Sequence, residues 1–480
     1  MCTAAAAAYR VLLLATMHDV PGDGPSRAAI AMAWARAPEL PTCGGWPPGH
    51  VLLAGLFQML LPGPASTRLL NVVLGTLSVP LLYAAVARTW DRGVALLAAA
   101  MLAVLPLHAE LAATSLTEAT FTCALLLAWW LLVRAAQADA PGARGARVPA
   151  LLAAGLALSL AQMLRYEGWA FAPVVVVWWL WCTRSARHAA LLAALVLWFP
   201  IAWTAGNARC GDAFLGFHAA LGELAVPTDG DPIAKVTFAA RVVRGELGVL
   251  ATLAVLAGAA WEIVLLRRGR SSRERVLAIA FTGTAWAVLG AAVAARGASV
   301  WTRYFVPALV LALPFAAASL QLARGDGRLR RRAVTLVAGV LLLALVVPDL
   351  AGRRSRHWLR AEPPRAAAGV AAWLAADPAR MRMPILATPA GWELTYLPLL
   401  APDAYWRFRT CSPWSADQDV VRWIDALRGA GPFLVITRDG DEAELARLER
   451  AAGRPLAVGA PVLSADGVRA YVVQLPAAAS

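Results

Sequence analysis

The chain has 480 residues, of which 60% are hydrophobic and only 15% are charged, and its formal net charge is +14. This composition excludes an ordinary soluble enzyme and predicts an integral membrane protein. The positive charge comes almost wholly from arginines in short clusters between apolar runs, and Lys235 is the only lysine. Such clusters are typical of the cytoplasmic loops of membrane proteins, so we expect no nucleic-acid partner.

Apolar runs in chain order predict about eleven transmembrane helices in the lipid bilayer. They lie at residues 3–17, 68–87, 92–107, 113–133, 148–164, 169–183, 188–204, 245–266, 276–295, 302–322 and 333–350. Strand-like segments at 383–389, 432–437 and 468–475 and a charged helix at 441–450 follow them. The predicted fold class is a polytopic α-helical membrane domain at 1–350 with a small soluble α/β domain at 351–480.

The arginine clusters orient these helices in the membrane. All five clusters fall on one side when the spans alternate, and by the positive-inside rule that side is the cytoplasm. The clusters are Arg88 and Arg92; Arg134, Arg144 and Arg147; Arg184 and Arg187; Arg267, Arg268, Arg270, Arg273 and Arg275; and Arg324, Arg328, Arg330, Arg331 and Arg332. The external loop 18–67 and the C-terminal domain are then expected on the opposite face.

The first external loop contains the stretch HDVPGDGPSR, with Asp19 and Asp23 in it. Its glycines and prolines predict a sharp turn, in which a solvated turn aspartate is the plain alternative to a catalytic carboxylate. Residues 27–37 then predict an amphipathic surface helix, and residues 45–61 an apolar helix too short to span the bilayer. This loop is therefore expected to lie at the membrane surface.

Further ionisable and aromatic residues lie near the outer ends of later spans. They are Arg68 at the start of the second span, Glu118 inside the fourth, Arg165, Tyr166 and Glu167 in RYEGW, and Arg303 and Tyr304 in WTRYF. Most of these residues also have a purely structural explanation: the arginines can snorkel to the membrane interface, and the aromatic residues can form an interfacial belt. An acid inside a span is costly, so Glu118 favours a functional role.

Carboxylates and arginines gathered on one membrane face suit group transfer from a lipid phosphate. A carboxylate can take the proton from an acceptor nucleophile, while arginines neutralise the phosphate of the leaving group. The main alternative is a transporter or flippase of a lipid-linked or anionic solute, which predicts mid-membrane charges and repeated broken helices. A scaffold that displays the C-terminal domain is a third possibility.

These motifs resemble those of GT-C glycosyltransferases of the family 39 kind, related to protein O-mannosyltransferases and to the enzymes that add aminoarabinose to lipid A. The matching pieces are GDGPSRAAIA (22–31), WPPGH (46–50), TRLLNVVLGTLSVPLLY (67–83), SLTEATF (115–121) and RYFVPAL (303–309). The resemblance implies an inverting hexosyl- or pentosyltransferase of the bacterial inner membrane. Its donor is a polyprenyl-phosphate-linked sugar, its acceptor is a hydroxyl group, and its active site faces the periplasm.

The resemblance also assigns roles to residues. Asp23 is the implied catalytic base and Asp19 the second choice. Gly24 stands where the family often has a second acid, so that role falls to Asp19 or Glu118 or is absent. The residues expected to bind the donor phosphate are Arg68, Arg303 and Arg165, and those expected to complete the pocket are Tyr166, Glu167, His50 and Tyr304.

Cofactors and disulfides are not expected. His18, His50 and His108 share the outer face with the two aspartates, so a divalent metal could be held there. The resembling enzymes do not generally require a metal, and we therefore expect none. Cys43, Cys210 and Cys411 fall on the same face, where a disulfide is conceivable, but no spacing supports one.

Overall fold

The computed structural model describes most of the chain. The described residues are 1–20, 22–42, 44–138, 147–209, 232–294, 301–322, 338, 339, 342, 345, 358–387, 392–404, 408–410, 424, 431–438, 442–453, 456–465 and 468–474. By their internal contacts they form a helical unit (Met1–Ala15, Leu40–Leu53, Arg68–Arg356) and a mixed unit (Thr16–Glu39, Ala54–Thr67, His357–Ser480). The mixed unit joins part of the first predicted loop to the C-terminal residues, and the boundary at residue 350 stays a prediction.

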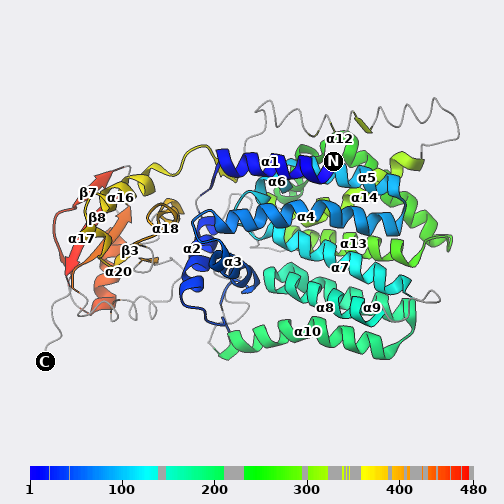
Figure 1. Ribbon diagram of the computed structural model, residues 1–480, viewed down its shortest axis with the longest axis horizontal. Helices are drawn as coiled ribbons and strands as arrows, with labels where there is room; N and C mark the ends of the chain where they lie inside the picture. Colours follow the sequence, from blue (N-terminus) through cyan, green and yellow to red (C-terminus); the bar gives the residue numbers. More distant parts are fainter. Residues whose placement is uncertain are drawn as a thin grey trace. The chain divides into compact units, whose positions relative to one another are not determined.

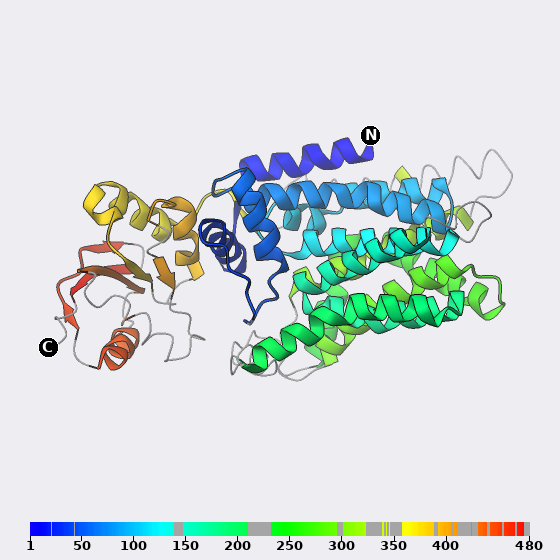
Figure 2. The same ribbon diagram turned by 60° about the horizontal axis from the view of Figure 1, so that its bottom comes forward.

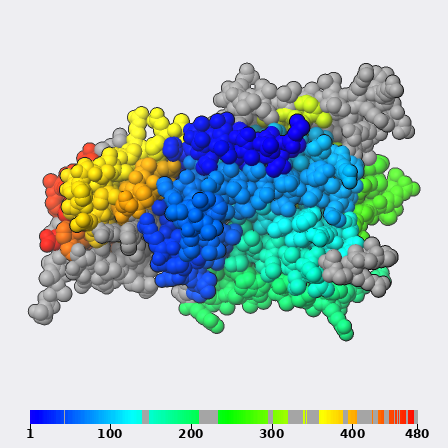
Figure 3. All heavy atoms as spheres, in the orientation of Figure 1, coloured from blue at the N-terminus to red at the C-terminus, as the bar shows by residue number. Residues whose placement is uncertain are grey.

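The helical unit consists of long apolar helices, many of which lie side by side (Figures 1 and 2). They are α1 (Cys2–Thr16), α4 (Ser66–Thr89), α5 (Arg92–Val104), α6 (Pro106–Ala112), α7 (Glu118–Gln137), α8 (Arg147–Leu164), α9 (Phe171–Thr183), α10 (Ala186–Arg209), α12 (Pro232–Arg267), α13 (Arg273–Ala294) and α14 (Val306–Leu322). The short 3₁₀ helices η2 (Tyr166–Ala170) and η3 (Thr302–Phe305) precede α9 and α14. In the space-filling view α1 (dark blue) lies on the surface beside lighter blue residues (Figure 3), and its Arg10 contacts Ala103 of α5 and His108 of α6.

Membrane crossing is supported by helix length and composition. Among the described residues, seven helices are long and apolar enough to span a bilayer, or eight if the bent pair α5 and α6 forms one span. The predicted polytopic helical fold is therefore confirmed, but the predicted number of eleven spans is not. The predicted span 333–350 lies almost entirely outside the described residues.

Two predicted spans differ from the helices in the structure. The predicted span 92–107 is interrupted after Val104, where α5 and α6 meet at 59°. Leu105 takes an extended conformation there because it precedes Pro106, which disfavours the helical region and donates no hydrogen bond. The predicted span 245–266 is longer, since α12 begins at Pro232 and continues across a break at Gly248, whose φ is 73°.

The two ends of the helical unit carry different side chains. At one end Arg88 donates a hydrogen bond to Gln137 (3.1 Å), and the Trp178 indole donates one to the carbonyl of Arg273 (3.0 Å). These residues lie at or near helix ends beside loops that the arginine pattern assigns to the cytoplasm. Arg68 and Glu118 lie at the opposite ends of α4 and α7, and Glu118 contacts Arg165 and Arg303 there. The segregation agrees with the alternation of spans, and the assignment of the compartments stays a prediction.

The mixed unit contains a six-stranded sheet in the order β4-β3-β5-β8-β6, with β7 also paired to β8. Its strands are β3 (Ile385–Ala387), β4 (Phe408–Thr410), β5 (Phe433–Arg438), β6 (Ala457–Val458), β7 (Leu463–Ala465) and β8 (Val468–Gln474). Strand β3 runs parallel to β4 and β5, whereas β8 runs antiparallel to β5, β6 and β7. Strands β3 and β8 fall within two of the three segments that the sequence indicates, and β5 extends one residue beyond the third.

Both faces of this sheet are buried, as the alternation along β5 requires. Leu434 and Ile436 face one core, with α2 (Asp23–Arg36), α16 (Arg365–Ala375) and α18 (Leu397–Leu400). Phe433 and Val435 face the other, with α20 (Glu442–Ala452). Two short elements complete this part of the chain. Helix α17 (Pro378–Met381) lies between α16 and β3, and η4 (Trp392–Tyr396) lies between β3 and α18. Helix α2, although part of the first loop, thus completes one core of this unit.

The helix predicted at residues 45–61 is present, and three of the six cysteines lie in the described part of the chain. Helix α3 (Gly49–Leu60) lies within the predicted interfacial segment 45–61 and exposes Leu56 and Leu60. Cys43, Cys210 and Cys411 lie outside the described residues. The other three cysteines are free thiols.

Candidate active site

Arg165 is the centre of a group of charged residues at the end of α8. It follows the last residue of α8 in an extended conformation (φ −152°, ψ 143°), and the 3₁₀ helix η2 follows it. One terminal nitrogen (Nη1) lies 2.5 Å from Glu118 Oε1 and donates to the Thr117 hydroxyl at 3.1 Å. The other terminal nitrogen lies 2.5 Å from Glu167 Oε1, and Nε lies 3.1 Å from the same oxygen. Arg165 thus binds two carboxylates at once.

Glu118 is the most buried acid of this group, with only 1% of its side chain exposed. It occupies the first turn of α7, where the partial positive charge of the helix N-terminus stabilises a carboxylate. Arg303 approaches it from η3, with Nε at 3.5 Å from Glu118 Oε1. Its second oxygen, Oε2, has no hydrogen-bond partner among the residues that the structure describes. Glu118 Oε1 therefore lies close to both Arg165 and Arg303, and Oε2 can accept a further hydrogen bond.

Tyr304 links the two arginines through its ring. The guanidinium carbon of Arg165 lies 5.2 Å from the ring centroid, and that of Arg303 lies 5.6 Å from it. Such cation–π contacts strengthen when they are shielded from water. We call Glu118, Arg165, Glu167, Arg303 and Tyr304 the charged cluster; all five belong to the helical unit.

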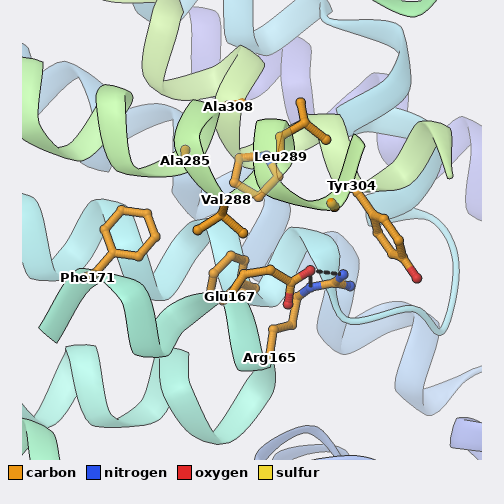
Figure 4. A pocket seen from close by; sticks show the side chains of 11 residues that line it. Arg165, Glu167, Phe171, Ala285, Val288, Leu289, Tyr304 and Ala308 are labelled. Carbon is orange, nitrogen blue, oxygen red and sulfur yellow. Dashed lines mark hydrogen bonds and ion pairs between the residues drawn. The ribbon is translucent and has the colours of Figure 1, made fainter. Parts of the chain in front are cut away.

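A pocket of about 50 Å³ adjoins the charged cluster. Figure 4 shows Glu167 and Arg165 facing each other, with Phe171, Val288 and Leu289 beside them. The remaining lining residues are Phe121, Ala285, Ala292, Tyr304, Pro307 and Ala308. This volume holds a few water molecules but no sugar. The pocket therefore joins a charged end to an apolar wall formed by α7, α9, α13 and α14.

Arg165 and Glu167 stabilise each other's charged forms. Burial alone raises the pKa of Glu167, but Arg165 outweighs it and holds the Glu167 pKa below its ordinary value. Burial likewise works to lower the pKa of Arg165, whereas Glu167 and Glu118 raise it above the ordinary value. The two arginines and two glutamates balance formally, so an entering anion has to share arginines that already hold carboxylates.

Arg68 and Asn71 support the segment that leads into Glu118. Arg68 Nε donates to the carbonyl of Ala113 at 2.6 Å. One turn later, the Asn71 amide donates to the carbonyls of Thr114 (2.7 Å) and Leu116 (2.6 Å). The predicted phosphate-binding Arg68 thus lies beside the peptide that carries Glu118. Asn71 was not among the predicted site residues, although a polar residue three positions after Arg68 falls on the same helix face.

Tyr166 and His50 are two of the residues predicted to complete the pocket. The Tyr166 hydroxyl donates to the carbonyl of Gly45 (3.3 Å) and accepts from the Trp203 indole (3.1 Å). Burial raises the pKa of Tyr166. His50 is fully buried in the first turn of α3. Tyr166 therefore connects η2 to α10 and to the residues before α3, a structural role that its position in RYEGW did not indicate.

The two predicted acids of the first loop belong to the mixed unit. Asp23 is the first residue of α2 and is partly exposed, whereas Asp19 lies in the short strand β1 (His18–Asp19) with only 1% exposed. The Asp19 carboxyl carbon lies 3.4 Å from the point where a Cβ on Gly24 would stand. Gly24, which follows Asp23, therefore packs directly against the buried Asp19. Of the two acids, Asp23 is therefore the more exposed.

In the described residues, no group of three or more histidines, cysteines, aspartates or glutamates is arranged to hold a metal ion. The expectation that no metal is needed stays a prediction.

Sequence comparison finds one family among the sugar-transferring enzymes. The family model for dolichyl-phosphate-mannose-protein mannosyltransferases matches residues 46–204, a stretch that contains Arg68, Glu118 and Arg165. No curated protein sequence matches the chain.

Solved structures share the fold over nearly the whole chain. ArnT from Cupriavidus metallidurans, bound to undecaprenyl phosphate, matches 100% of this chain and 98% of its own, with a TM-score of 0.65 at 15% identity. The chain has the GT-C fold and resembles glycosyltransferase family 39. A second structure, the oligosaccharyltransferase AglB from Archaeoglobus fulgidus with an inhibitory peptide and a dolichol-phosphate, matches 95% of this chain and 70% of its own (TM-score 0.58, 12% identity).

A third match is the arabinofuranosyltransferase AftD from mycobacteria, which covers 99% of this chain and 42% of its own, with a TM-score of 0.54 at 17% identity. The family model and the shared fold together support a membrane glycosyltransferase of the GT-C type. The resemblance drawn from the motifs is thereby confirmed.

Proposed function

We propose that this GT-C protein transfers a sugar from a polyprenyl-phosphate-linked donor to an acceptor hydroxyl, at the periplasmic face of a bacterial inner membrane. The observation that carries this function is the charged cluster beside the apolar pocket. In it, Arg165 and Arg303 both contact the buried Glu118. An anionic head group and an apolar chain need this combination of surfaces. The lipid phosphates bound in ArnT and AglB support the same class of donor.

The arginines would act on the leaving group. When the bond between the anomeric carbon of the sugar and the phosphate oxygen breaks, that oxygen gains negative charge. Guanidinium groups held in a site of low water content stabilise such charge strongly. We assign this role to Arg68 and Arg303, assisted by Arg165. Because Glu118 and Glu167 contact Arg165 directly, we assign them the role of orienting the arginines.

Asp23 would act on the acceptor. Its carboxylate takes the proton of the acceptor hydroxyl while the hydroxyl oxygen attacks the anomeric carbon on the side opposite the phosphate. The new glycosidic bond forms as the bond to the phosphate breaks, and the polyprenyl phosphate leaves with the electron pair. One displacement of this kind inverts the anomeric configuration. Asp23 suits this role better than Asp19 because it is partly exposed at the start of α2.

A transfer assay tests this function directly. The full chain in liposomes is given polyprenyl-phosphate-linked hexose or pentose donors and a mixture of hydroxyl acceptors. We expect release of polyprenyl phosphate together with a glycoside of inverted anomeric configuration, measured by mass spectrometry and NMR. Movement of intact donor across the bilayer without sugar release would instead establish a flippase. If neither reaction occurs and a photoactivatable polyprenyl phosphate does not crosslink to the chain, the proposed donor is wrong.

Metal removal gives a second expected result. We expect sugar transfer to continue unchanged, within about twofold, after treatment with EDTA and gel filtration, because arginines rather than a metal neutralise the leaving phosphate. Inductively coupled plasma analysis of the treated protein verifies that divalent ions are gone. A loss of transfer that Mg²⁺ or Mn²⁺ restores would show that a metal takes part.

A further inference from the structure

The stretch that carries the two aspartates is held by residues from far along the chain. Strand β1 pairs antiparallel with β2 (Leu359–Arg360), with Asp19 opposite Leu359. The amide of Val20 continues this pairing by donating to the carbonyl of Trp358 at 3.1 Å. A two-residue strand pair is too short to be stable by itself, so further contacts have to hold it.

Gly22 is the point at which the chain turns into α2. Its backbone (φ 123°, ψ −134°) is one that residues with a side chain rarely adopt. Its carbonyl accepts the first hydrogen bond of the helix, from the amide of Ser26 at 3.1 Å. Its own amide donates to the hydroxyl of Thr395 at 2.9 Å. Thr395 therefore holds the amide of the residue that immediately precedes Asp23.

Tyr396, the next residue of η4, holds the other side of the turn. Its hydroxyl lies 3.2 Å from His18 Nδ1, and the two rings meet edge to face with centroids 6.3 Å apart. Its side chain is 4% exposed and belongs to the same core as Ala28 and Met32 of α2. Thr395 and Tyr396 thus contact Gly22 and His18, one at each end of the turn. The core that contains Tyr396 also packs against α2, the helix that follows the turn.

We propose that Thr395 is a positioning residue for Asp23, and that the C-terminal part of the mixed unit serves catalysis by holding the acid-bearing turn. This inference rests on the proposed role of Asp23 as the base. A base has to stand within hydrogen-bond reach of the proton that it removes, and a displacement of about 1 Å can slow a reaction by about 10²-fold. The hydrogen bond from Gly22 to Thr395 removes the freedom that a glycine turn otherwise has.

The test compares two substitutions at one position. Thr395→Val keeps the shape of the side chain but removes the hydroxyl acceptor, whereas Thr395→Ser keeps the acceptor. For Thr395→Val we expect kcat to fall about tenfold or more, with KM for the donor within about twofold, because Asp23 acts on the acceptor and not on donor binding. Thr395→Ser is expected to stay within about twofold of the wild type in both constants.

Hydrogen–deuterium exchange supplies a readout that does not depend on activity. We expect Thr395→Val to speed exchange in a peptide covering residues 18–27 and to leave the strand β5 unchanged. Thr437→Val is the matched control, because it makes the same substitution at a buried position of β5. The control is expected to leave exchange in 18–27 as in the wild type.

Each outcome has a separate meaning. If the wild type transfers sugar and Thr395→Val matches it in kcat and in exchange, the positioning role is wrong. If Thr437→Val lowers kcat as much as Thr395→Val does, the effect is a general loss of stability and the positioning role is again wrong. If the wild type transfers no sugar, the proposed function fails, and faster exchange in 18–27 of Thr395→Val still establishes the hold on the turn.

Discussion

Asp23→Asn is expected to lower kcat for sugar transfer by about 10²- to 10⁴-fold, the usual contribution of a general base. The amide has nearly the same size as the carboxylate but cannot take the proton of the acceptor. An asparagine is also well tolerated at the start of a helix, so α2 is expected to form as before. Initial rates of polyprenyl phosphate release measure the loss, and crosslinking with a photoactivatable polyprenyl phosphate shows that donor binding persists.

Two further substitutions provide a control for Asp23→Asn and a test of the second candidate base. Asp403→Asn is the matched control, since Asp403 is exposed in a turn of the same unit, and its kcat is expected to stay within about twofold of the wild type. Asp19→Asn tests the second candidate. Full transfer by Asp23→Asn together with a large loss in Asp19→Asn would move the role of base to Asp19.

The sequence was enough to predict which residues belong to the charged cluster, but not which of them contact one another. The position of Glu118, Arg165 and Arg303 at the span ends opposite the arginine clusters follows from hydropathy and from the clusters themselves, which are properties of the sequence alone. Their pairing depends on the direction in which Arg165 leaves α8. That direction is set by its extended backbone and by the 3₁₀ turn of η2, and no periodic pattern encodes it.

The surroundings of the two aspartates were beyond sequence reasoning for a different reason. Strands β1 and β2 have two residues each, so neither has an alternating pattern that could reveal it. The contacts of Gly22 with Thr395 and of His18 with Tyr396 join distant parts of the chain. By contrast, β5 and β8 are long and apolar enough to be predicted within a residue or two of their ends.

Arg165→Ala is expected to have the largest effect on stability of any single change in the charged cluster. It leaves Glu118, with 1% of its side chain exposed, without the partner at 2.5 Å. Removing one member of a buried ion pair costs about 3–5 kcal/mol, mainly because the remaining charge is left poorly compensated. We expect the thermal unfolding midpoint in detergent to fall clearly, and sugar transfer to fall at least about 100-fold because the cluster loses its central arginine.

A double variant separates the two effects of this substitution. Adding Glu118→Gln removes the uncompensated charge, so Arg165→Ala/Glu118→Gln is expected to regain at least half of the lost unfolding midpoint, as coupled neighbours do. Transfer is expected to stay low, since no arginine is restored. Arg134→Ala is the matched control at an exposed position of α7, with an expected change within about 0.5 kcal/mol. If the double variant is no more stable than Arg165→Ala, the ion pair is not what stabilises this site, and if it transfers sugar at the wild-type rate, Arg165 has no part in the reaction.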